Sequence, residues 1–439
     1  MVRGPLLSHV ASSSTASPAS RYPGRSIARV TCALLVAVAP AAFACGTDAG
    51  PTGSASATSP AETSGDAAPG NGDGTSTTSD ASATDAAVTD ATNTDAVDSS
   101  APPWVVGQPF PIEGFGAATK GGFQIGHDVY HVTSLADAGP GSLRTGLATN
   151  DAPRVIVFDL DGDIMLTSAL VVPANVTIDG RGRRVTVRNK GFVVPGKSEV
   201  ILVNLAIAGV SPDSEDGIQI GHPTNGPSEH VVIDHVAFLQ TGSAGDSKNV
   251  DEAISVIFGS RFVTIAWCRF ERWEKVMLFG NGDAPAVTDA AMRITVHHSY
   301  GLETGRRHPQ ARHGFFDFYD NEWDDWRMYG WVFESPYRES FGAQAQDGAR
   351  LIVESQIFRR HAVAFDALSQ ADDATRCESG GVLDERGSWT PPDSTAPLVH
   401  GAGCPALAAP LARPYTAIVD PAGPALRTTL ETKTGNVLF

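Results

Sequence analysis

A short β-branched run recurs along the middle of the chain and decides the fold. Residues 263–267 read Val-Thr-Ile-Ala-Trp, residues 231–235 read Val-Val-Ile-Asp-His, and residues 294–298 read Ile-Thr-Val-His-His. Similar runs begin at residues 176, 200, 316 and 351, so that successive runs start 24, 31, 32, 31, 22 and 35 residues apart. Each run has the length of one strand and is bounded by residues that favour turns, which predicts a β-strand at every repeat.

No amphipathic helix pattern separates these strands, and a repeat of this length is typical of a stacked solenoid. A β-sandwich, which would show turns about every 8–12 residues, is the alternative. Side chains at equivalent corners of a solenoid can stack from coil to coil, and the candidates here are Asp179, Asn204, His235, Trp267, His298 and Asn321. The sequence therefore predicts an all-β fold, a parallel β-helix, in which irregular spacings mark coils with long loops.

The composition excludes several classes of protein. The chain has 32 Lys and Arg against 49 Asp and Glu, a net charge of −17, so nucleic acid bound through a basic surface is disfavoured as a partner. Five cysteines are too few for a disulfide-dense scaffold. Cys268 lies in a strand run and is expected in the core. Cys377 and Cys404 could pair in an oxidising compartment.

The first 103 residues differ from the rest of the chain. Residues 1–45 contain arginines, a short apolar stretch and Ala-Phe-Ala before Cys45, which is the pattern of an export signal or a bacterial lipoprotein signal. Cys45 is thus a candidate lipid anchor, and we expect a secreted protein or one at the bacterial cell surface. Residues 46–103 contain nine acidic residues, no Lys or Arg and no aromatic residue, so we expect a disordered spacer.

The rest of the chain divides in two. Residues 104–372 hold the strand runs and form the predicted β-helix domain. Residues 373–439 are rich in Pro, Ala and Gly and form a C-terminal extension that could cap or wrap the end of the helix. A monomer is the default expectation.

Three groups of charged residues could carry chemistry. Three arginines, among them Arg307 and Arg312, fall within one stretch of seven residues in an acidic domain, which suits either a clamp for carboxylate or phosphate groups or a solvated basic turn. Lys275 lies among apolar and aromatic residues, as a positioned cation or as a surface side chain. Asp216 and Asp251 open strand runs in successive coils, where they could supply oxygen ligands to calcium or be ordinary turn acids.

Taken in order, these groups and their surroundings resemble the pectate lyases of polysaccharide lyase family 1. The resemblance runs from about Gly114 to Arg360, and the order of its segments makes it specific. The segments include Gly114-Phe115-Gly116, Gly121-Gly122, Gly139-Pro140-Gly141-Ser142-Leu143-Arg144, Asp216-Gly217-Ile218, Val263-Thr264-Ile265, Lys275-Val276-Met277-Leu278-Phe279-Gly280 and Arg307-His308-Pro309-Gln310-Ala311-Arg312.

The resemblance implies a right-handed parallel β-helix and calcium-assisted β-elimination of polygalacturonate (pectate). It implies that Arg307 is the Brønsted base and that Lys275 and Arg312 contact substrate carboxylates. Two other functions stay open at this point. A pectin lyase would act on methyl-esterified chains without calcium, and a β-helix surface protein would bind polysaccharide without cleaving it.

The implied calcium site departs from the family pattern. Asp216 and Asp251 match calcium ligands of the family, but Ser255 stands four residues after Asp251, where the family has Asp. Ser214 stands where a further acid is often found. The third ligand position is therefore Ser255, with Glu252 as an alternative, and the carboxylates of the substrate could complete the coordination of calcium.

Deletion of residues 46–103 is expected to leave the activity and the melting temperature nearly unchanged, because the segment has almost no apolar groups that could dock on a folded domain. Thermal denaturation of the full-length and deleted proteins checks this expectation. A loss of several degrees in the deleted protein would show instead that the segment packs on the folded part.

Overall fold

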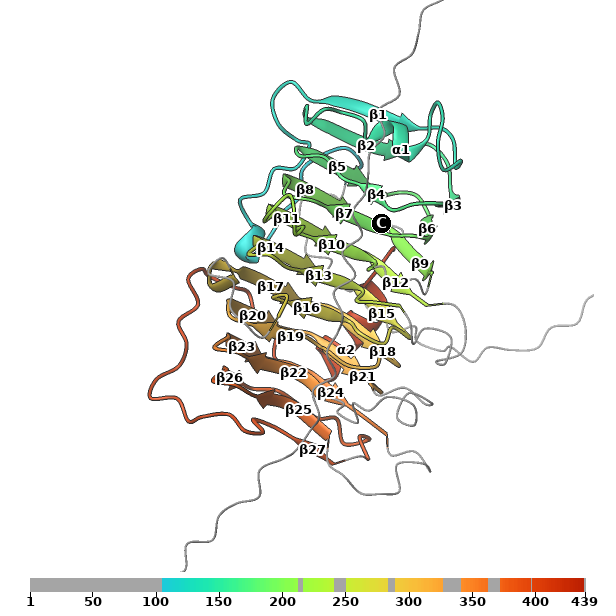
Figure 1. Cartoon of the computed structure of the whole chain (residues 1–439). Coiled ribbons are helices and arrows are strands. Elements are labelled where there is room, and N and C mark those ends of the chain that lie inside the picture. The colour runs from blue at the N-terminus through green and yellow to red at the C-terminus, as the bar shows by residue number, and fades with distance from the viewer. Residues whose placement is uncertain are drawn as a thin grey trace, which may run out of the picture. The chain divides into compact units, whose positions relative to one another are not determined.

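The computed structural model of the chain describes residues 105–211, 216–240, 250–282, 289–326, 341–361, 372–395 and 397–437 (Figure 1). The signal predicted for residues 1–45, with its candidate anchor Cys45, and the spacer predicted for residues 46–103 lie outside these residues. Among the residues described, no helix combines the length and the apolar character needed to cross a membrane.

In the described part of the chain the strands form three parallel sheets, here called A, B and C (Figure 1). Along most of the chain, successive strands belong to sheets A, B and C in this repeating order. Sheet A holds β1 (Asp128–Val132), β2 (Arg154–Phe158), β5 (Val176–Asp179), β8 (Ser198–Val203), β11 (Glu229–Asp234), β14 (Arg261–Ala266), β17 (Arg293–His297), β20 (Phe315–Tyr319), β23 (Arg350–Glu354) and β26 (Val382–Arg386). Sheet B holds β3 (Gly162–Met165), β6 (Val185–Asn189), β9 (Ala206–Val210), β12 (Ala237–Leu239), β15 (Arg269–Glu271), β18 (Tyr300–Leu302), β21 (Glu322–Asp324) and β24 (Ile357–Arg359).

Sheet C holds β4 (Leu170–Val171), β7 (Phe192–Val194), β10 (Ile218–Ile220), β13 (Ile254–Val256), β16 (Met277–Phe279), β19 (Gln310–Arg312), β22 (Phe341–Gln346), β25 (Asp372–Cys377) and β27 (Leu398–Val399). The described helical elements are η1 (Gly114–Gly116), α1 (Leu143–Gly146), η2 (Asp289–Ala291) and α2 (Pro424–Lys433). Neighbouring strands of each sheet pair in parallel, which confirms the predicted right-handed parallel β-helix and excludes the sandwich.

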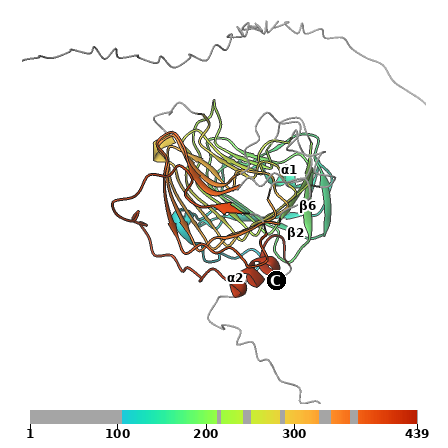
Figure 2. The same ribbon diagram turned by 90° about the horizontal axis from the view of Figure 1, so that it is seen from below.

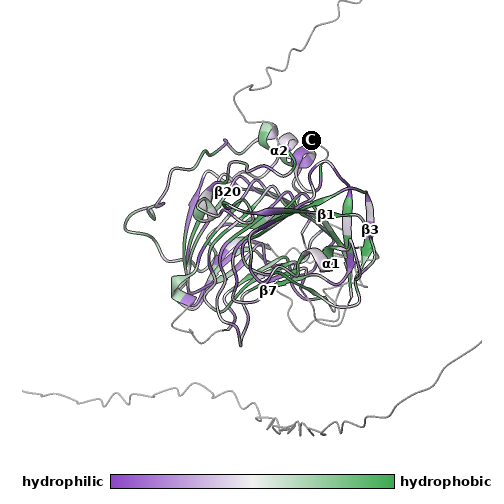
Figure 3. Ribbon diagram, turned by 90° about the horizontal axis from the view of Figure 1, so that it is seen from above, coloured by the Kyte–Doolittle hydropathy of each residue, from purple (hydrophilic) through white to green (hydrophobic). Residues whose placement is uncertain are grey.

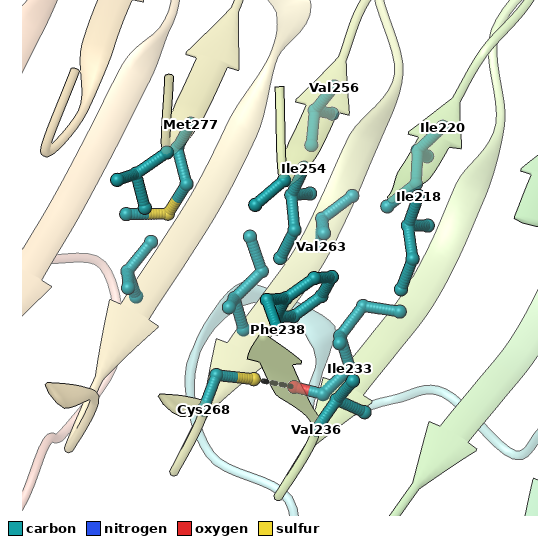
Figure 4. Packing of buried hydrophobic residues seen from close by; sticks show 14 of the residues in the cluster. Ile218, Ile220, Ile233, Val236, Phe238, Ile254, Val256, Val263, Cys268 and Met277 are labelled. Carbon is teal, nitrogen blue, oxygen red and sulfur yellow. Dashed lines mark hydrogen bonds between the residues drawn. The ribbon is translucent and has the colours of Figure 1, made fainter. Parts of the chain in front are cut away.

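The three sheets enclose a common core (Figure 2). Inward side chains of successive coils stack on one another. In sheet C, Ile218, Ile254 and Met277 hold the same register position and are buried (Figure 4). Hydrophobic and hydrophilic segments are interspersed around the coils (Figure 3), and successive side chains of a strand face opposite sides of the sheet. Cys268 is fully buried, as predicted, with its thiol 3.7 Å from the carbonyl oxygen of Ile233 (Figure 4).

Side chains stack at the corner between sheets A and B, as predicted. The ring centroid of Trp267 lies 5.6 Å from that of His235 and 4.3 Å from that of His298. All three residues have positive φ, between 49° and 52°, and Asn204 occupies the same corner with a φ of 57°. This left-handed conformation turns the chain sharply from one sheet into the next.

Two of the predicted corner residues were wrong by one position. The stacked position lies two residues after the last core residue of each sheet A strand. By strand register, Asp179 lies one residue before it and Asn321 one residue after it. Asp320 takes the position that we assigned to Asn321.

A segment near the start of the described chain covers the outer face of sheet A. The backbone N–H groups of Phe115 and Gly116 donate to the hydroxyl oxygens of Thr295 and Thr264, at 3.0 and 2.9 Å. Gly114 has a φ of 81°, and a Cβ atom there would lie 2.6 Å from the side chain of Thr295. The glycines of the Gly-Phe-Gly segment are thus required by the close approach of its backbone to two threonines of sheet A.

The coils continue past residue 372, so the domain boundary that we predicted there is too early. β25 pairs with β22, β26 with β23, and β27 with β25. Cys377, at the end of β25, forms a disulfide with Cys404, one of the possibilities that the sequence left open.

The remainder of the extension wraps back along the outside of the helix. Arg413 forms an ion pair with Asp317 at 2.6 Å, and the Asn436 amide donates to the carbonyl oxygen of Asn204, far back along the coils. α2 lies outside the sheets (Figure 2) and packs on sheet B through a buried cluster that contains Leu426, Leu430, Tyr300 and Ile357.

Replacing Leu430 by alanine tests the docking of α2. Leu430 is fully buried, so Leu430→Ala is expected to lower the free energy of unfolding by about 2–4 kcal/mol. Urea denaturation measures the difference. Thr428→Ala, on the exposed side of the same helix, is the control and should change stability by less than about 0.5 kcal/mol. Equal effects of the two substitutions would mean that α2 does not pack on sheet B.

Candidate active site

The predicted site residues lie where the chain enters sheet C. Asp216 precedes β10, Asp251 precedes β13, Lys275 precedes β16 and Arg307 precedes β19. These strands are neighbours in the sheet, in this order (Figure 1). Stacking in register therefore gathers residues of four successive coils at one edge of sheet C.

Three carboxylates converge at this edge. Asp216, Asp251 and Glu252 each place one oxygen within 4.8 Å of the other two. The Asp216 carboxylate also accepts a hydrogen bond from the backbone N–H of Glu252 at 3.0 Å. A group of carboxylate oxygens is the donor set that a hard cation such as calcium prefers. The residues present therefore fit calcium, and Glu252 joins the two aspartates in the cluster.

Two cations lie against the same carboxylates. The Lys275 ammonium donates to Asp251 Oδ1 at 2.7 Å, and the Arg307 guanidinium forms an ion pair with Glu252. The Arg307–Glu252 pair is largely shielded from solvent, where charge interactions are stronger than at an open surface, whereas the Lys275–Asp251 pair is partly exposed. The structure thus brings four of the predicted residues into one cluster of alternating charge.

The ionised form of Asp216 is disfavoured in this cluster. Burial raises the pKa of this carboxyl to about 7, and the negative charge of Asp251 adds to the increase. A hydrogen bond from Ser255 and the positive charges of Lys275 and Arg307 act in the opposite direction. A carboxylate that is destabilised in this way gains from a bound cation.

Ser255, the third predicted metal-binding residue, lies beside Asp216. It is in β13 between two core residues, so its side chain faces outward. Its hydroxyl bonds with the Asp216 carboxylate and supplies a neutral oxygen where the family pattern has a charged one. Glu252 restores a third negative charge. The sequence signal for Glu252 was only its place next to Asp251.

The two arginines of the basic segment differ in their surroundings. Burial lowers the pKa of Arg307 to about 10, and the positive charge of Arg312 contributes to the decrease. Arg312 lies at the other end of β19, where its Nε donates to Gln346 at 3.2 Å and lies 3.6 Å from Asp347 Oδ2. Sequence reasoning missed these two partners, because only the pairing of β19 with β22 brings them near.

Sequence reasoning also missed Glu274. Burial raises the pKa of this carboxyl to about 7, against the positive charges of Arg306 and Lys275. The Arg306 guanidinium lies 3.7 Å away. Among the described residues, Glu274 Oε2 has no hydrogen-bond partner. When ionised, this carboxylate interacts electrostatically with Lys275.

Comparisons with known proteins identify the family to which the chain is similar. A family model described as pectate lyase matches residues 34–382. A pectate lyase of Nicotiana tabacum is 33% identical over 236 residues, which cover 49% of this chain and 56% of that protein. A probable pectate lyase of Solanum lycopersicum is 30% identical over 298 residues, which cover 63% of this chain and 68% of that protein. The chain thus spans between about half and two thirds of the length of these relatives.

Solved structures share the fold. The major allergen of cedar pollen, jun a 1, superposes with a TM-score of 0.59 at 24% identity, covering 74% of this chain and 93% of that one. A Bacillus pectate lyase solved in complex with trigalacturonate gives a TM-score of 0.52 at 19% identity and covers 74% and 98% of the two chains. At these identities the structural likeness supports the β-helix alone.

The raised pKa of Asp216 predicts how stability responds to pH. The pKa is about 7 in the folded protein and 3.8 in an unperturbed chain, so the folded protein holds this proton more tightly. Its contribution to stability is therefore lost as pH rises through this range and levels off above pH 7. Asp216→Asn removes this dependence. In calcium-free buffer the melting temperature of the variant, relative to wild type, should be higher at pH 8 than at pH 5.

Thermal denaturation with chelator present gives the comparison. Asp163→Asn is the matched control, because Asp163 is exposed and paired with Arg188. Its effect should be the same at both pH values. A difference for Asp216→Asn that does not change with pH would contradict the raised pKa.

Proposed function

This chain belongs to the pectate lyase family, and we propose that it cleaves polygalacturonate by calcium-assisted β-elimination, giving unsaturated galacturonides. One observation carries the proposal: Asp216, Asp251 and Glu252 meet Lys275 and Arg307 at a single edge of sheet C. The site therefore places carboxylates that could bind a cation next to basic side chains that could bind an anionic polymer.

The reaction removes the proton on the carbon next to a uronate carboxylate. The electron pair of that C–H bond forms a carbon–carbon double bond, and the glycosidic C–O bond breaks with its electrons on the leaving oxygen, which takes a proton from water. Negative charge builds up on the carboxylate as the proton leaves. Positive groups placed against that carboxylate lower the barrier because they stabilise this charge. Asp216, Asp251 and Glu252 would hold calcium here, and a bound calcium ion would supply such positive charge.

Arg307 is the proposed base. An arginine is ordinarily protonated at any working pH, which makes it a poor base. Burial and the charge of Arg312 lower the pKa of Arg307 to about 10 and so favour its neutral form, against the negative charges of Asp251 and Asp216. This direction supports a base role and an alkaline optimum, since the neutral fraction grows as pH rises toward 10.

Lys275 and Arg307 are paired with the same acids that would hold the cation. Lys275 lies on Asp251 and Arg307 on Glu252. If Asp251 and Glu252 bound a cation, their electrostatic attraction for Lys275 and Arg307 would become weaker. Each is then available to the substrate, Lys275 for a uronate carboxylate and Arg307 for the proton. Arg312, at the other end of β19, is proposed to contact a further carboxylate of the polymer.

The acid cluster favours this proposal over the two alternatives. A pectin lyase acting without calcium has no use for three converging carboxylates. A surface protein that only binds polysaccharide has no use for a buried arginine with a lowered pKa. We also propose that the protein is exported, as residues 1–45 predict. An enzyme that cleaves a polysaccharide of this kind meets its substrate outside the cell.

Removing the base should abolish turnover. We expect Arg307→Ala to lose product formation, read as ultraviolet absorbance of the unsaturated ends, with unchanged far-ultraviolet circular dichroism. Arg307→Lys should also fail largely, because the planar guanidinium is lost although the charge is kept. Arg188→Ala, which removes an arginine from a surface ion pair, is the control. Turnover near that of wild type in Arg307→Ala would refute the mechanism.

Chelation separates the candidate functions. Cleavage of polygalacturonate that stops with chelator and returns with calcium supports the proposal. Cleavage of methyl-esterified pectin that persists in chelator would identify a pectin lyase instead. Binding of polygalacturonate without any product would identify the non-catalytic protein.

A further inference from the structure

A second group of potential metal ligands lies away from the proposed active site, at the corner between sheets A and B. It consists of His298, Asp320 and Asp420, each with one ligand atom within 4.8 Å of the others. His298 and Asp320 follow neighbouring strands β17 and β20, whereas Asp420 belongs to the C-terminal extension. The group therefore joins the wrapped extension to the coils.

The distances within the group suit ligands of one cation. His298 Nε2 lies 3.5 Å from Asp320 Oδ2 and 3.5 Å from Asp420 Oδ2. Both separations are long for a charged hydrogen bond. A zinc ion about 2.0–2.1 Å from each of three tetrahedral ligand atoms would hold those atoms roughly 3.3–3.4 Å apart. The observed spacing needs only a small closure to reach that geometry.

Asp320 supplies an independent sign of a missing partner. Its side chain has no exposed surface, and Oδ1 has no hydrogen-bond partner among the described residues. Oδ2 accepts from the backbone N–H of Asp420 at 2.9 Å. A buried carboxylate oxygen without a partner costs free energy that a cation would recover. The neighbouring acids Asp420 and Glu354 add to this cost, and Arg413 offsets part of it.

The imidazole of His298 is held in place for this role. Its ring stacks on Trp267 at 4.3 Å between centroids, and its Nδ1 lies 3.0 Å from Nδ1 of His297. A metal-binding histidine typically has its second nitrogen engaged in this way, which fixes the ring and leaves the other nitrogen for the metal. Asp420 is about half exposed, so a cation can reach the group from solvent.

We propose that His298, Asp320 and Asp420 bind one divalent transition-metal ion, of which zinc is the best fit, and that the ion fastens the C-terminal extension to the helix. One imidazole nitrogen and two carboxylate oxygens favour zinc over calcium, which takes oxygen ligands. Solvent would complete the coordination. A third acidic group, Glu322, Asp324 and Glu431, offers no imidazole and is already neutralised in part by Arg427 and Arg359.

Zinc titration of the full-length, tag-free protein after chelator treatment tests the proposal. We expect one tight zinc site by calorimetry and a higher melting temperature with zinc. Asp420→Asn keeps the size of the side chain and the backbone hydrogen bond, and should weaken zinc binding at least tenfold and remove the thermal shift. Asp159→Asn is the matched control. It breaks a surface pair of Asp159 with His131 at 2.7 Å and should bind zinc as wild type does.

Two outcomes would overturn the proposal. Equal zinc affinities of wild type and Asp420→Asn would mean that these three residues form a hydrogen-bonded contact only. Loss of the zinc site in Asp251→Ala would place the ion at the proposed active site instead. Asp420→Asn should cleave polygalacturonate at the wild-type rate under calcium, so failure of the zinc site leaves the proposed function standing, and the reverse also holds.

Discussion

Parallel pairing between successive coils is the constraint on which the rest of this structure depends. Each strand bonds to the strand one coil before and one coil after it, so residues about 20–35 positions apart become neighbours at a fixed register. Inward positions then hold an apolar stack such as Ile218, Ile254 and Met277. A slip of one residue would turn every one of these side chains outward. The same register places acids and cations of four coils at one edge of sheet C.

Charge compensation governs that edge. Taking several ionised groups out of water is costly unless they are paired. The pairs Lys275–Asp251 and Arg307–Glu252 reduce this cost, but Asp216 is left with a pKa raised to about 7. Additional positive charge at this edge would therefore reduce the electrostatic cost that remains at Asp216. Asp216 thus lowers the stability of the folded protein, and a bound cation would offset this loss.

The C-terminal extension gives the β-helix a second set of long-range contacts. A solenoid is otherwise stabilised only between adjacent repeats. Here Arg413 reaches Asp317 and Glu354, α2 packs on sheet B, and Asn436 reaches the coil of Asn204. These contacts tie together coils that do not touch one another. The extension also contacts the corner stack, through Asp420 at His298 and Asn436 at Asn204.

The sequence by itself determined the repeat, the strand positions and the identity of the chemical groups, because β-branched runs, turn residues and the Arg307 to Arg312 segment are local signals. It located Asp216, Asp251, Lys275 and Arg307 through their segments. Only the tertiary structure decided which of them meet. The place of Glu252, the partners of Arg312 and the course of the extension all depend on pairing between residues far apart in the chain. Loops of different length separate the strands, so a local sequence pattern does not define which residues of successive coils pair. The register that brings distant charges together is therefore known only from the three-dimensional structure.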